Sequence, residues 1–322
     1  MEIFNLTLNQ MLIMFTLILA GVFLRKKMVL SENSGTIMAK LETYIFVPAL
    51  TLHTMIANCN VKTFMDNYTL IVYGFIIVLI SILISYPLST LFVKKTENSD
   101  SANYQRNIYK YAMVYGNYGF VGNFIILGVW GDEMFYKYTM FVMLVDILCK
   151  SWGLYILIPK EHNESIWKNL KKGLLTPPII ALVVSILIGL SGMSRYIPGF
   201  LIGAFDNAGK CQGPVAMLLA GFVIGGYDLK KLLANKKVYI ATVLRLIVLP
   251  GILMIVLKFL KVPEEIMILA LIAFATPLGL NTIVYPAAYG GETQTGASMA
   301  MISHTLSVIT IPLMYLIFIV IL

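Results

Sequence analysis

The stretch YGNYGFVGN, residues 115–123, interrupts one long apolar run of this chain, and ATPLGLNTIVYP, residues 275–286, interrupts another. Glycine adopts backbone conformations that other residues avoid, and proline removes a backbone donor and disturbs the preceding helical turn. Both stretches also carry asparagine, whose amide is expensive to place in an apolar environment. These two stretches therefore predict broken helices rather than a bundle of continuous ones.

The composition around these stretches is that of a membrane protein. Of the 322 residues, 59% are hydrophobic and only 12% are charged, about half the charged fraction of an average soluble domain. A soluble chain of this length could not bury so much apolar surface in one core. The apolar runs continue for about 20 residues without alternation, which favours helices over barrel strands. The sequence thus predicts an all-α polytopic protein in a lipid bilayer.

Hydropathy predicts about ten transmembrane spans. Their residue ranges are 6–24, 37–56, 69–93, 108–129, 135–158, 174–192, 200–226, 238–259, 266–289 and 297–322. The first range ends in Arg-Lys-Lys without a small-residue cleavage site, so we interpret it as a span rather than a secretory signal.

Basic residues predict the orientation in the cell membrane. The first, third, fifth and seventh loops are the richer ones, with Arg25, Lys26, Lys27, Lys94, Lys95, Arg106, Lys160, Lys168, Lys171, Lys172, Lys230, Lys231, Lys236 and Lys237. Loops rich in Lys and Arg stay in the cytoplasm, which places both termini outside. The same rule explains the formal charge of +8 without a nucleic-acid partner.

The fifth loop, residues 159–173, divides the chain into residues 1–158 and 174–322, each with five predicted spans. An odd number of spans per half gives the halves opposite orientations, as in inverted-repeat transporters. Pro48 in the second span has a counterpart in Pro214 in the seventh, and the two interrupted spans are the fourth and the ninth. Interruptions at equivalent positions of two halves point to a transporter's binding site.

The interruptions supply the candidate substrate-binding residues, namely Asn117, Gly119, Gly122, Asn123, Pro277, Gly279 and Asn281. Two breaks that meet would present half-helix N-termini, each with about half a positive charge, to a shared centre. That environment suits a carboxylate. The alternative is that Gly and Pro here only kink the helices or let them pack closely.

Ionisable residues inside spans are the second set of candidates, for charge or coupling, because each is costly at bilayer depth. Asp146 and Lys150 lie four residues apart and can pair on one helix face, and Asp206 and Lys210 repeat that spacing. Structural pairing and ligand binding are equally compatible with this spacing. Arg245 either extends to the cytoplasmic interface, pairs with a group on another helix, or attracts an anion.

The sequence gives little indication of catalytic, metal-binding or redox chemistry. Metalloprotease, phosphate-loop and Gly-x-Ser-x-Gly motifs are missing from the sequence, so we predict no enzyme, no catalytic or metal site and no cofactor. The three cysteines are single and are expected to pack as small apolar residues. The lone His53 and His304 are expected to be hydrogen-bonded core histidines rather than a proton relay.

Several segments resemble the auxin efflux carrier family over nearly the whole chain. They are AKLETYIFVPALTLHTM (39–55), GNYGFVGNFIILGVWGDE (116–133), GPVAMLLAGFVIG (213–225), LRLIVLP (244–250) and ATPLGLNTIVYPAAYGGE (275–292). Each is loose by itself, whereas their order and spacing together are specific. The family usually has proline where this chain has Asn123, so the first break depends here on glycines and Asn123.

The resemblance implies ten helices in two inverted five-helix repeats, with helices four and nine broken and crossing, as in bile-acid/sodium symporters. It also implies an elevator-like motion, a carboxylate substrate held by Asn117 and Asn281, and a homodimer by fold analogy. We therefore expect a secondary transporter of a small organic anion. The alternatives are a sodium-coupled symporter of the bile-acid type, a transmembrane anion sensor that moves nothing, and an intramembrane enzyme. Uniport, proton coupling and sodium coupling stay open, with Asp146 as the candidate proton or cation site.

Overall fold

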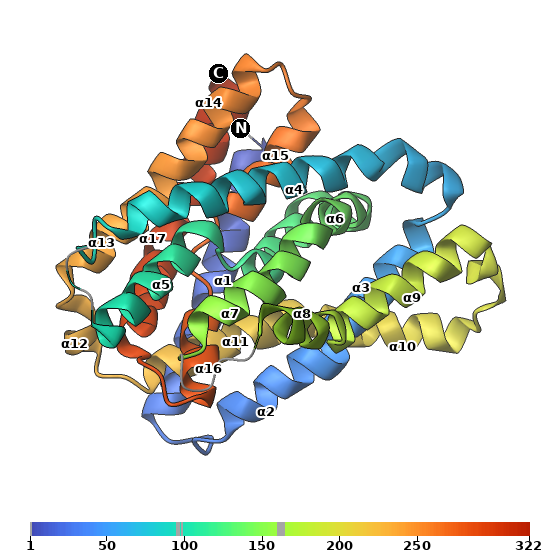
Figure 1. Cartoon of the computed structure of the whole chain (residues 1–322). Helices are drawn as coiled ribbons and strands as arrows, with labels where there is room; N and C mark the ends of the chain where they lie inside the picture. Colours follow the sequence, from blue (N-terminus) through green and yellow to red (C-terminus); the bar gives the residue numbers. More distant parts are fainter. Residues whose placement is uncertain (1, 95–96, 98, 160–164) are drawn as a thin grey trace.

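The computed structural model describes residues 2–94, 97, 99–159 and 165–322. Every regular element in these residues is a helix, and Figure 1 shows them as one elongated bundle. Within the same residues, six helices are long and apolar enough to cross a membrane. The prediction of an all-helical, multi-pass membrane protein is thereby confirmed.

The first half of the chain contains one long helix for some predicted spans and several short elements for others. In order these are α1 (Glu2–Lys26), α2 (Ser34–Leu41), η1 (Glu42–Phe46), α3 (Val47–Asn58), α4 (Val61–Ser89), α5 (Asp100–Val114), η2 (Tyr118–Gly122), α6 (Asn123–Leu148), η3 (Cys149–Gly153) and α7 (Leu154–Leu157). The elements η1, η2 and η3 are π-helical turns, which are frequent at functional sites.

The second half begins with α8 (Ile166–Leu174). It continues with α9 (Pro177–Ser191), η5 (Met193–Tyr196), α10 (Gly199–Lys210), α11 (Gln212–Gly225), α12 (Leu229–Leu233), α13 (Lys236–Val243), η6 (Leu244–Val248), α14 (Leu249–Phe259), α15 (Glu264–Phe274), α16 (Asn281–Ala288), α17 (Gln294–Tyr315) and η7 (Leu316–Ile321). Both termini lie at the upper end of the molecule in Figure 1.

The two interruptions lie side by side. Residues 115–117 separate α5 from η2, residues 275–280 separate α15 from α16, and Gly116 forms an antiparallel bridge with Leu278. The backbone N–H of Asn117 donates to the carbonyl of Pro277 at 2.7 Å, and the N–H of Leu278 donates to Ser303 Oγ at 2.9 Å. These bonds satisfy backbone groups that the broken helices leave free, as an apolar surrounding requires.

The first break is shorter than the glycine-rich motif that predicts it. Gly119 and Gly122 lie inside the π-turn η2, so only Gly116 of the three glycines belongs to the extended segment. A Cβ atom on Gly116 would lie 2.7 Å from the carbonyl oxygen of Thr276. Glycine is therefore required at that position by the close approach of the two segments.

The long helix α6 contains the end of the fourth predicted span and the first part of the fifth. Gly131, at φ 77° and ψ −166°, turns the chain sharply within it, a conformation that is essentially restricted to glycine. The predicted boundary between the fourth and fifth spans, residues 129–135, includes this turn.

Small residues bring the helices into close contact. A Cβ atom on Gly221 of α11 would lie 1.9 Å from the carbonyl of Ile18 in α1, and one on Gly74 of α4 would lie 1.9 Å from the carbonyl of Phe141 in α6. Helices in membranes associate through such small-residue contacts, because burial of apolar surface adds no driving force there. On the opposite side of the bundle, α3 packs against α9 and α10.

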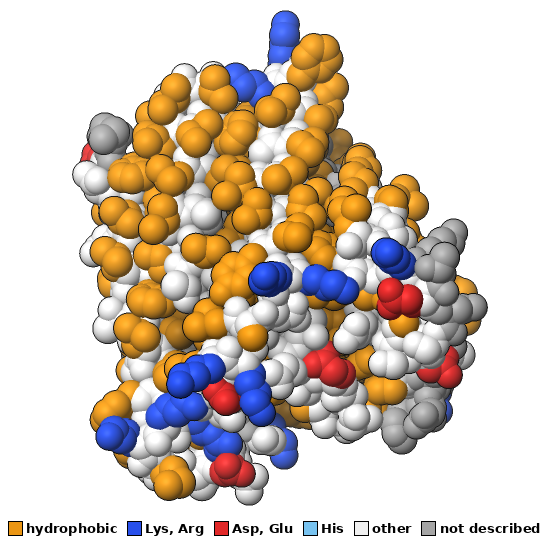
Figure 2. All heavy atoms as spheres, turned by 90° about the vertical axis from the view of Figure 1, so that its left-hand side faces the viewer, with side chains coloured by type: hydrophobic (Ala, Val, Ile, Leu, Met, Phe, Trp, Pro, Cys, Tyr) orange, Lys and Arg blue, Asp and Glu red, His pale blue; other side chains and the backbone are white. Residues whose placement is uncertain are grey.

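The surface follows the hydropathy pattern. Figure 2 shows a broad apolar band, with Lys and Arg side chains gathered below it on the side where α12 and α13 lie. The Lys26 ammonium donates to the carbonyl of Tyr227 at 2.8 Å, and that of Lys237 donates to the carbonyl of Phe92 at 2.6 Å. The first, third and seventh loops therefore lie together at one end of the molecule.

Candidate functional site

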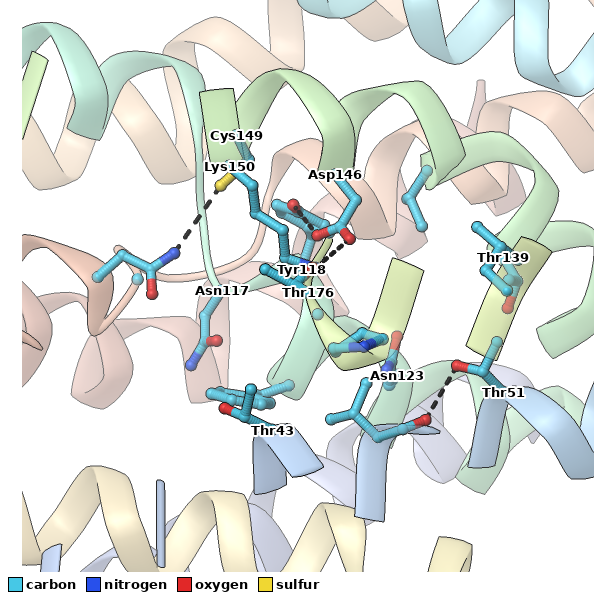
Figure 3. A pocket seen from close by; sticks show the side chains of 18 of the residues that line it. Thr43, Thr51, Asn117, Tyr118, Asn123, Thr139, Asp146, Cys149, Lys150 and Thr176 are labelled. Atoms are coloured by element: carbon cyan, nitrogen blue, oxygen red, sulfur yellow. Dashed lines mark hydrogen bonds and ion pairs between the residues drawn. The ribbon is translucent and has the colours of Figure 1, made fainter. Parts of the chain in front are cut away.

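A cavity of about 240 Å³ lies where the two interruptions meet. Figure 3 shows its polar side chains, with Asp146 and Lys150 on one side and Thr43 and Thr51 on the other. Its lining comes from both halves of the chain and comprises Thr43, Val47, Thr51, Gly116, Asn117, Tyr118, Gly119, Phe120, Asn123, Phe135, Thr139, Val142, Met143, Asp146, Cys149, Lys150, Thr176, Pro178, Leu182, Gly279, Leu280, Asn281 and Tyr285.

Asn117 is held at the cavity wall by His304 of α17. The side-chain nitrogen of Asn117 lies 3.2 Å from His304 Nε2, and His304 Nδ1 lies 2.7 Å from the carbonyl oxygen of Ala300. Because a carbonyl only accepts, Nδ1 is the donor, and Nε2 of the neutral ring accepts from Asn117. This bond fixes the amide and leaves its oxygen and second N–H for other partners. His304 is the hydrogen-bonded core histidine that the sequence predicts, and it also orients a cavity residue.

Asn281, the first residue of α16, is held from the other side. Its side-chain nitrogen donates to the hydroxyl of Tyr111 at 2.8 Å and lies 3.8 Å from Cys149 Sγ. The Tyr111 hydroxyl is in turn 3.1 Å from the same sulfur. The two asparagines are therefore both oriented by buried neighbours, as a binding site with a defined geometry requires.

The charged groups of the cavity wall form one connected cluster. The Lys150 ammonium donates to Asp146 Oδ2, and the Tyr118 hydroxyl donates to Asp146 Oδ1 at 2.9 Å. The Tyr138 hydroxyl donates to the backbone carbonyl of Tyr118 at 3.0 Å. The predicted pair of Asp146 and Lys150 is present, and it links the fifth predicted span to the start of η2.

Two helix N-termini face the cavity. The first turn of η2, which α6 continues, begins at Tyr118, and α16 begins at Asn281. The first N–H groups of a helix carry partial positive charge, although those of Thr282 and Ile283 in α16 already donate to the carbonyls of Gly279 and Leu280. Among the residues that the structure describes, the cavity thus offers amide donors and one ammonium group beside a single carboxylate.

The structure separates the predicted site residues into two groups. Those that line the cavity are Asn117, Gly119, Asn123, Asp146, Lys150, Gly279 and Asn281. Gly122 lies behind the wall, where a Cβ atom would be 2.1 Å from the Tyr138 hydroxyl. Pro277 does not line the cavity either, but its carbonyl accepts from the backbone N–H of Asn117. Lys210 is exposed and pairs with Asp206 at 2.6 Å, away from the cavity.

Arg245 is buried behind the bridged segments. Its side chain is 2% exposed, so it does not extend to the interface. Its guanidinium lies 6.0 Å from the ring centre of Phe274, and a Cβ atom on Gly116 would lie 2.8 Å from its Nη2. Among the residues that the structure describes, Arg245 Nε and Nη2 have no hydrogen-bond partner. Arg245 therefore contributes positive charge to the bridged segments without touching the cavity.

Comparison of the chain with known protein families gives a match over nearly its whole length. The family model described as membrane transport protein matches residues 6–315 of the chain. The chain belongs to this family. The match includes both interruptions and confirms the resemblance to the auxin efflux carriers that the sequence motifs indicate.

A relative of known sequence supports the same assignment. The chain is 24% identical to an uncharacterized transporter of the archaeon Methanocaldococcus jannaschii, over 95% of this chain and 97% of the relative. Because the alignment covers nearly all of both chains, the two proteins are similar over their whole length and not over a fragment. Both comparisons concern membrane transporters, in agreement with the prediction that the chain is not an enzyme.

Sequence reasoning missed four side chains that hold Asn117, Asn281 and Asp146 in place. Tyr111, Tyr118 and Cys149 are ordinary residues of apolar spans by composition, and His304 is predicted only as a core residue. A signal does exist for the tyrosines, because Tyr111, Tyr115 and Tyr118 cluster immediately before and within the glycine-rich motif. Their hydroxyl groups must find partners when buried.

Proposed function

We propose that this protein is a secondary transporter that binds a small organic anion in the cavity between the two interrupted helices. The observation that supports it most is the convergence of two helix N-termini and two oriented asparagine amides on one cavity. Helix N-termini bind anions through their free N–H groups. A volume of about 240 Å³ lies near the lower end of ligand pockets, which favours a small carboxylate.

The proposal includes ten spans in two inverted repeats. Several features recur at equivalent places in the two halves. Gly131 and Gly290 both have positive φ, at 77° and 69°, and follow the two interrupted spans. The π-turns η3 and η7 lie near the ends of the fifth and tenth spans. The packing of α1 on α11 is matched by that of α9 on α3. These recurrences support a pseudo-two-fold relation.

Alternating access would come from movement between the two walls of the cavity. One wall consists of η1, α3 and α9, which contribute Thr43, Val47, Thr51, Thr176, Pro178 and Leu182. The other consists of the interrupted helices with α6 and η3. The first wall contributes no charged side chain to the cavity lining, so the charged wall can slide along it in an elevator-like motion without breaking an ion pair.

The proposed membrane orientation is based on where the basic loops lie. The first, third and seventh loops gather at one end of the molecule, and both termini lie at the other. We propose that the basic end faces the cytoplasm of the cell membrane. A homodimer stays a prediction from the family resemblance.

The experiment that tests this function is uptake of labelled carboxylates into liposomes that contain the purified protein. The panel is benzoate, malonate and indole-3-acetate, and sodium and pH gradients are varied separately. We expect the wild-type protein to show saturable uptake of a carboxylate. Asn117→Ala and Asn281→Ala should each reduce this uptake at least about tenfold, since each removes an oriented amide that would bind the ligand. The matched control is Asn207→Ala, because Asn207 is exposed, does not line the cavity, and its side-chain amide donates to the carbonyl of Gly203 in the same helix.

The outcomes separate the rival functions. Uptake that survives both cavity variants would place the anion elsewhere. Uptake that requires a sodium gradient would favour the sodium-coupled symporter. Binding of a carboxylate without any flux from folded protein would favour the transmembrane sensor and contradict the transporter.

A further inference from the structure

The charge of the cavity lining is balanced before any ligand enters. Among the described residues that line the cavity, Asp146 and Lys150 are the charged ones, and they pair with each other. Their side chains are 28% and 18% exposed, so both can be reached from the cavity. An incoming monoanion therefore adds one negative charge that no further charged side chain of the described lining balances, and such a charge is costly in a largely apolar site.

The geometry of Asp146 indicates how that charge can be balanced. Its Oδ1 accepts from the Tyr118 hydroxyl, and its Oδ2 accepts from the Lys150 ammonium. A proton on Oδ2 would take the place of the ammonium and leave the bond to Tyr118 intact. Lys150 would then be free to pair with a carboxylate in the cavity.

We propose that this transporter moves one proton together with each monoanion, with Asp146 as the proton site and Lys150 exchanging Asp146 for the substrate carboxylate. The inference rests on the proposed function and names its coupling ion. In the empty state, ionised Asp146 neutralises Lys150. In the loaded state, neutral Asp146 lies beside a pair formed by Lys150 and the substrate, so the net charge is the same in both states.

Asp146 is the one carboxylate among the described residues that line the cavity. Lys150 and Cys149 face it from η3, Tyr118 from η2, Tyr115 from the first interruption and Tyr285 from α16. The residues of α3 and α9 that line the cavity do not titrate. Free cysteine, tyrosine and lysine lose their protons above about pH 8. Two carboxylates beside one ammonium favour protonation of one of them.

Positions elsewhere in the chain supply matched controls. Asp206 and Lys210 form the same i, i+4 pair at 2.6 Å, but neither lines the cavity. Glu42 is a second buried acid, with both carboxylate oxygens unpartnered among the described residues, and it does not line the cavity either. A proton taken up at Asp146 is thus distinguishable from one taken up at another buried or paired carboxylate.

The test is isothermal titration calorimetry of benzoate, malonate and indole-3-acetate into the full-length protein in detergent. Measurement in two buffers of different ionisation enthalpy, between pH 5 and 8, counts the protons bound with each anion. We expect proton uptake that approaches about one per monoanion, with a Kd that rises by up to about tenfold per pH unit. Asp206→Asn and Glu42→Gln should behave like wild type.

Asp146→Asn should bind with no proton uptake and with a Kd that is independent of pH. Carboxylate binding without proton uptake by wild type overturns the inference and leaves the proposed function standing, even where Asp146→Asn fails to fold. Proton uptake that persists in Asp146→Asn, or that disappears in Glu42→Gln, overturns it as well. Absence of binding by all three probes would overturn the proposed function itself.

Discussion

At the scale of single residues, the direction in which a side chain is held matters more for ligand binding than its residue type. Asn117 and Asn281 are both amides at interruptions, yet each is useful only because a buried neighbour fixes its direction. His304 accepts from the first and Tyr111 accepts from the second. A free asparagine would sample several rotamers and pay entropy on binding. The supporting residues are therefore expected to influence affinity although they do not line the cavity wall that the ligand meets.

His304→Phe tests this at the first asparagine. The ring keeps its approximate shape but can no longer accept from Asn117, which leaves a buried N–H unpaired at a cost of about 1–3 kcal/mol. We expect a lower melting temperature and a KM for the transported carboxylate raised at least about fivefold. His53→Phe is the control, because His53 lies outside the cavity near Asp206. An unchanged KM in folded His304→Phe would contradict the positioning role.

Gly122 and Gly119 provide a second test, since they are three residues apart but differ in surroundings. A Cβ atom on Gly122 would lie 2.1 Å from the Tyr138 hydroxyl, whereas one on Gly119 would meet nothing within 4 Å. Gly122→Ala should displace Tyr138 and break its bond to the carbonyl of Tyr118, at a cost of about 0.5–1.5 kcal/mol or more. Gly119→Ala should leave the melting temperature near that of wild type.

The double variant Gly122→Ala with Tyr138→Phe isolates the cause. Removal of the hydroxyl relieves the contact, so the double variant should melt above Gly122→Ala alone. Equal melting temperatures for Gly122→Ala and Gly119→Ala would show that Gly122 is not required by packing.

At the scale of elements, sharp changes of direction depend on particular glycines. The chain turns sharply within α6 at Gly131, whose backbone lies in a region that other residues avoid. Nothing lies within 4 Å of a Cβ atom at that position. The constraint is therefore conformational and not steric, which allows a clean comparison with a helical glycine that is equally uncrowded.

Gly131→Ala should lower stability by about 1–3 kcal/mol through backbone strain alone. Gly203 in α10 is the control, because a Cβ atom there also meets nothing within 4 Å. Gly203→Ala should be neutral or stabilising by about 0.5–1 kcal/mol, since alanine favours a helix. The measurement is thermal unfolding in detergent. Opposite signs for the two substitutions support the turn, and equal effects would contradict it.

At the scale of the whole molecule, the distribution of basic loops determines the proposed orientation. Contacts of Lys26 with Tyr227 and of Lys237 with Phe92 join three loops that are far apart in the sequence. Arg195, in the turn η5 between the sixth and seventh predicted spans, belongs to a loop predicted on the opposite face. Membrane orientation can therefore be tested with one residue from each set of loops.

The topology experiment uses a background in which Cys59, Cys149 and Cys211 are replaced by alanine. In intact cells, Arg195→Cys should react with a membrane-impermeant maleimide, whereas Lys231→Cys should react only after permeabilisation. Both positions are exposed, so a difference in labelling reports the side of the membrane. The reverse pattern would invert the proposed orientation.

The sequence by itself determines those features that depend on local composition. Continuous apolar runs of about 20 residues require helices in lipid, and Gly, Pro and Asn within two of those runs predict where the helices break. Both interruptions lie within the stretches that predict them, at residues 115–117 and 275–280. The family follows from the same stretches, because their order and spacing extend over the whole chain.

Only the tertiary structure decided which side chains meet at the site. Asn117 and His304 are 187 residues apart, and Tyr118 and Asp146 are 28 apart. Helices that are apolar on all sides give no sequence signal for the face that turns inward. The packing of α17, α6 and η3 around the interruptions selects that face. It places Arg245 behind the site, leaves Lys210 outside it and brings the pair of Asp146 and Lys150 to the cavity.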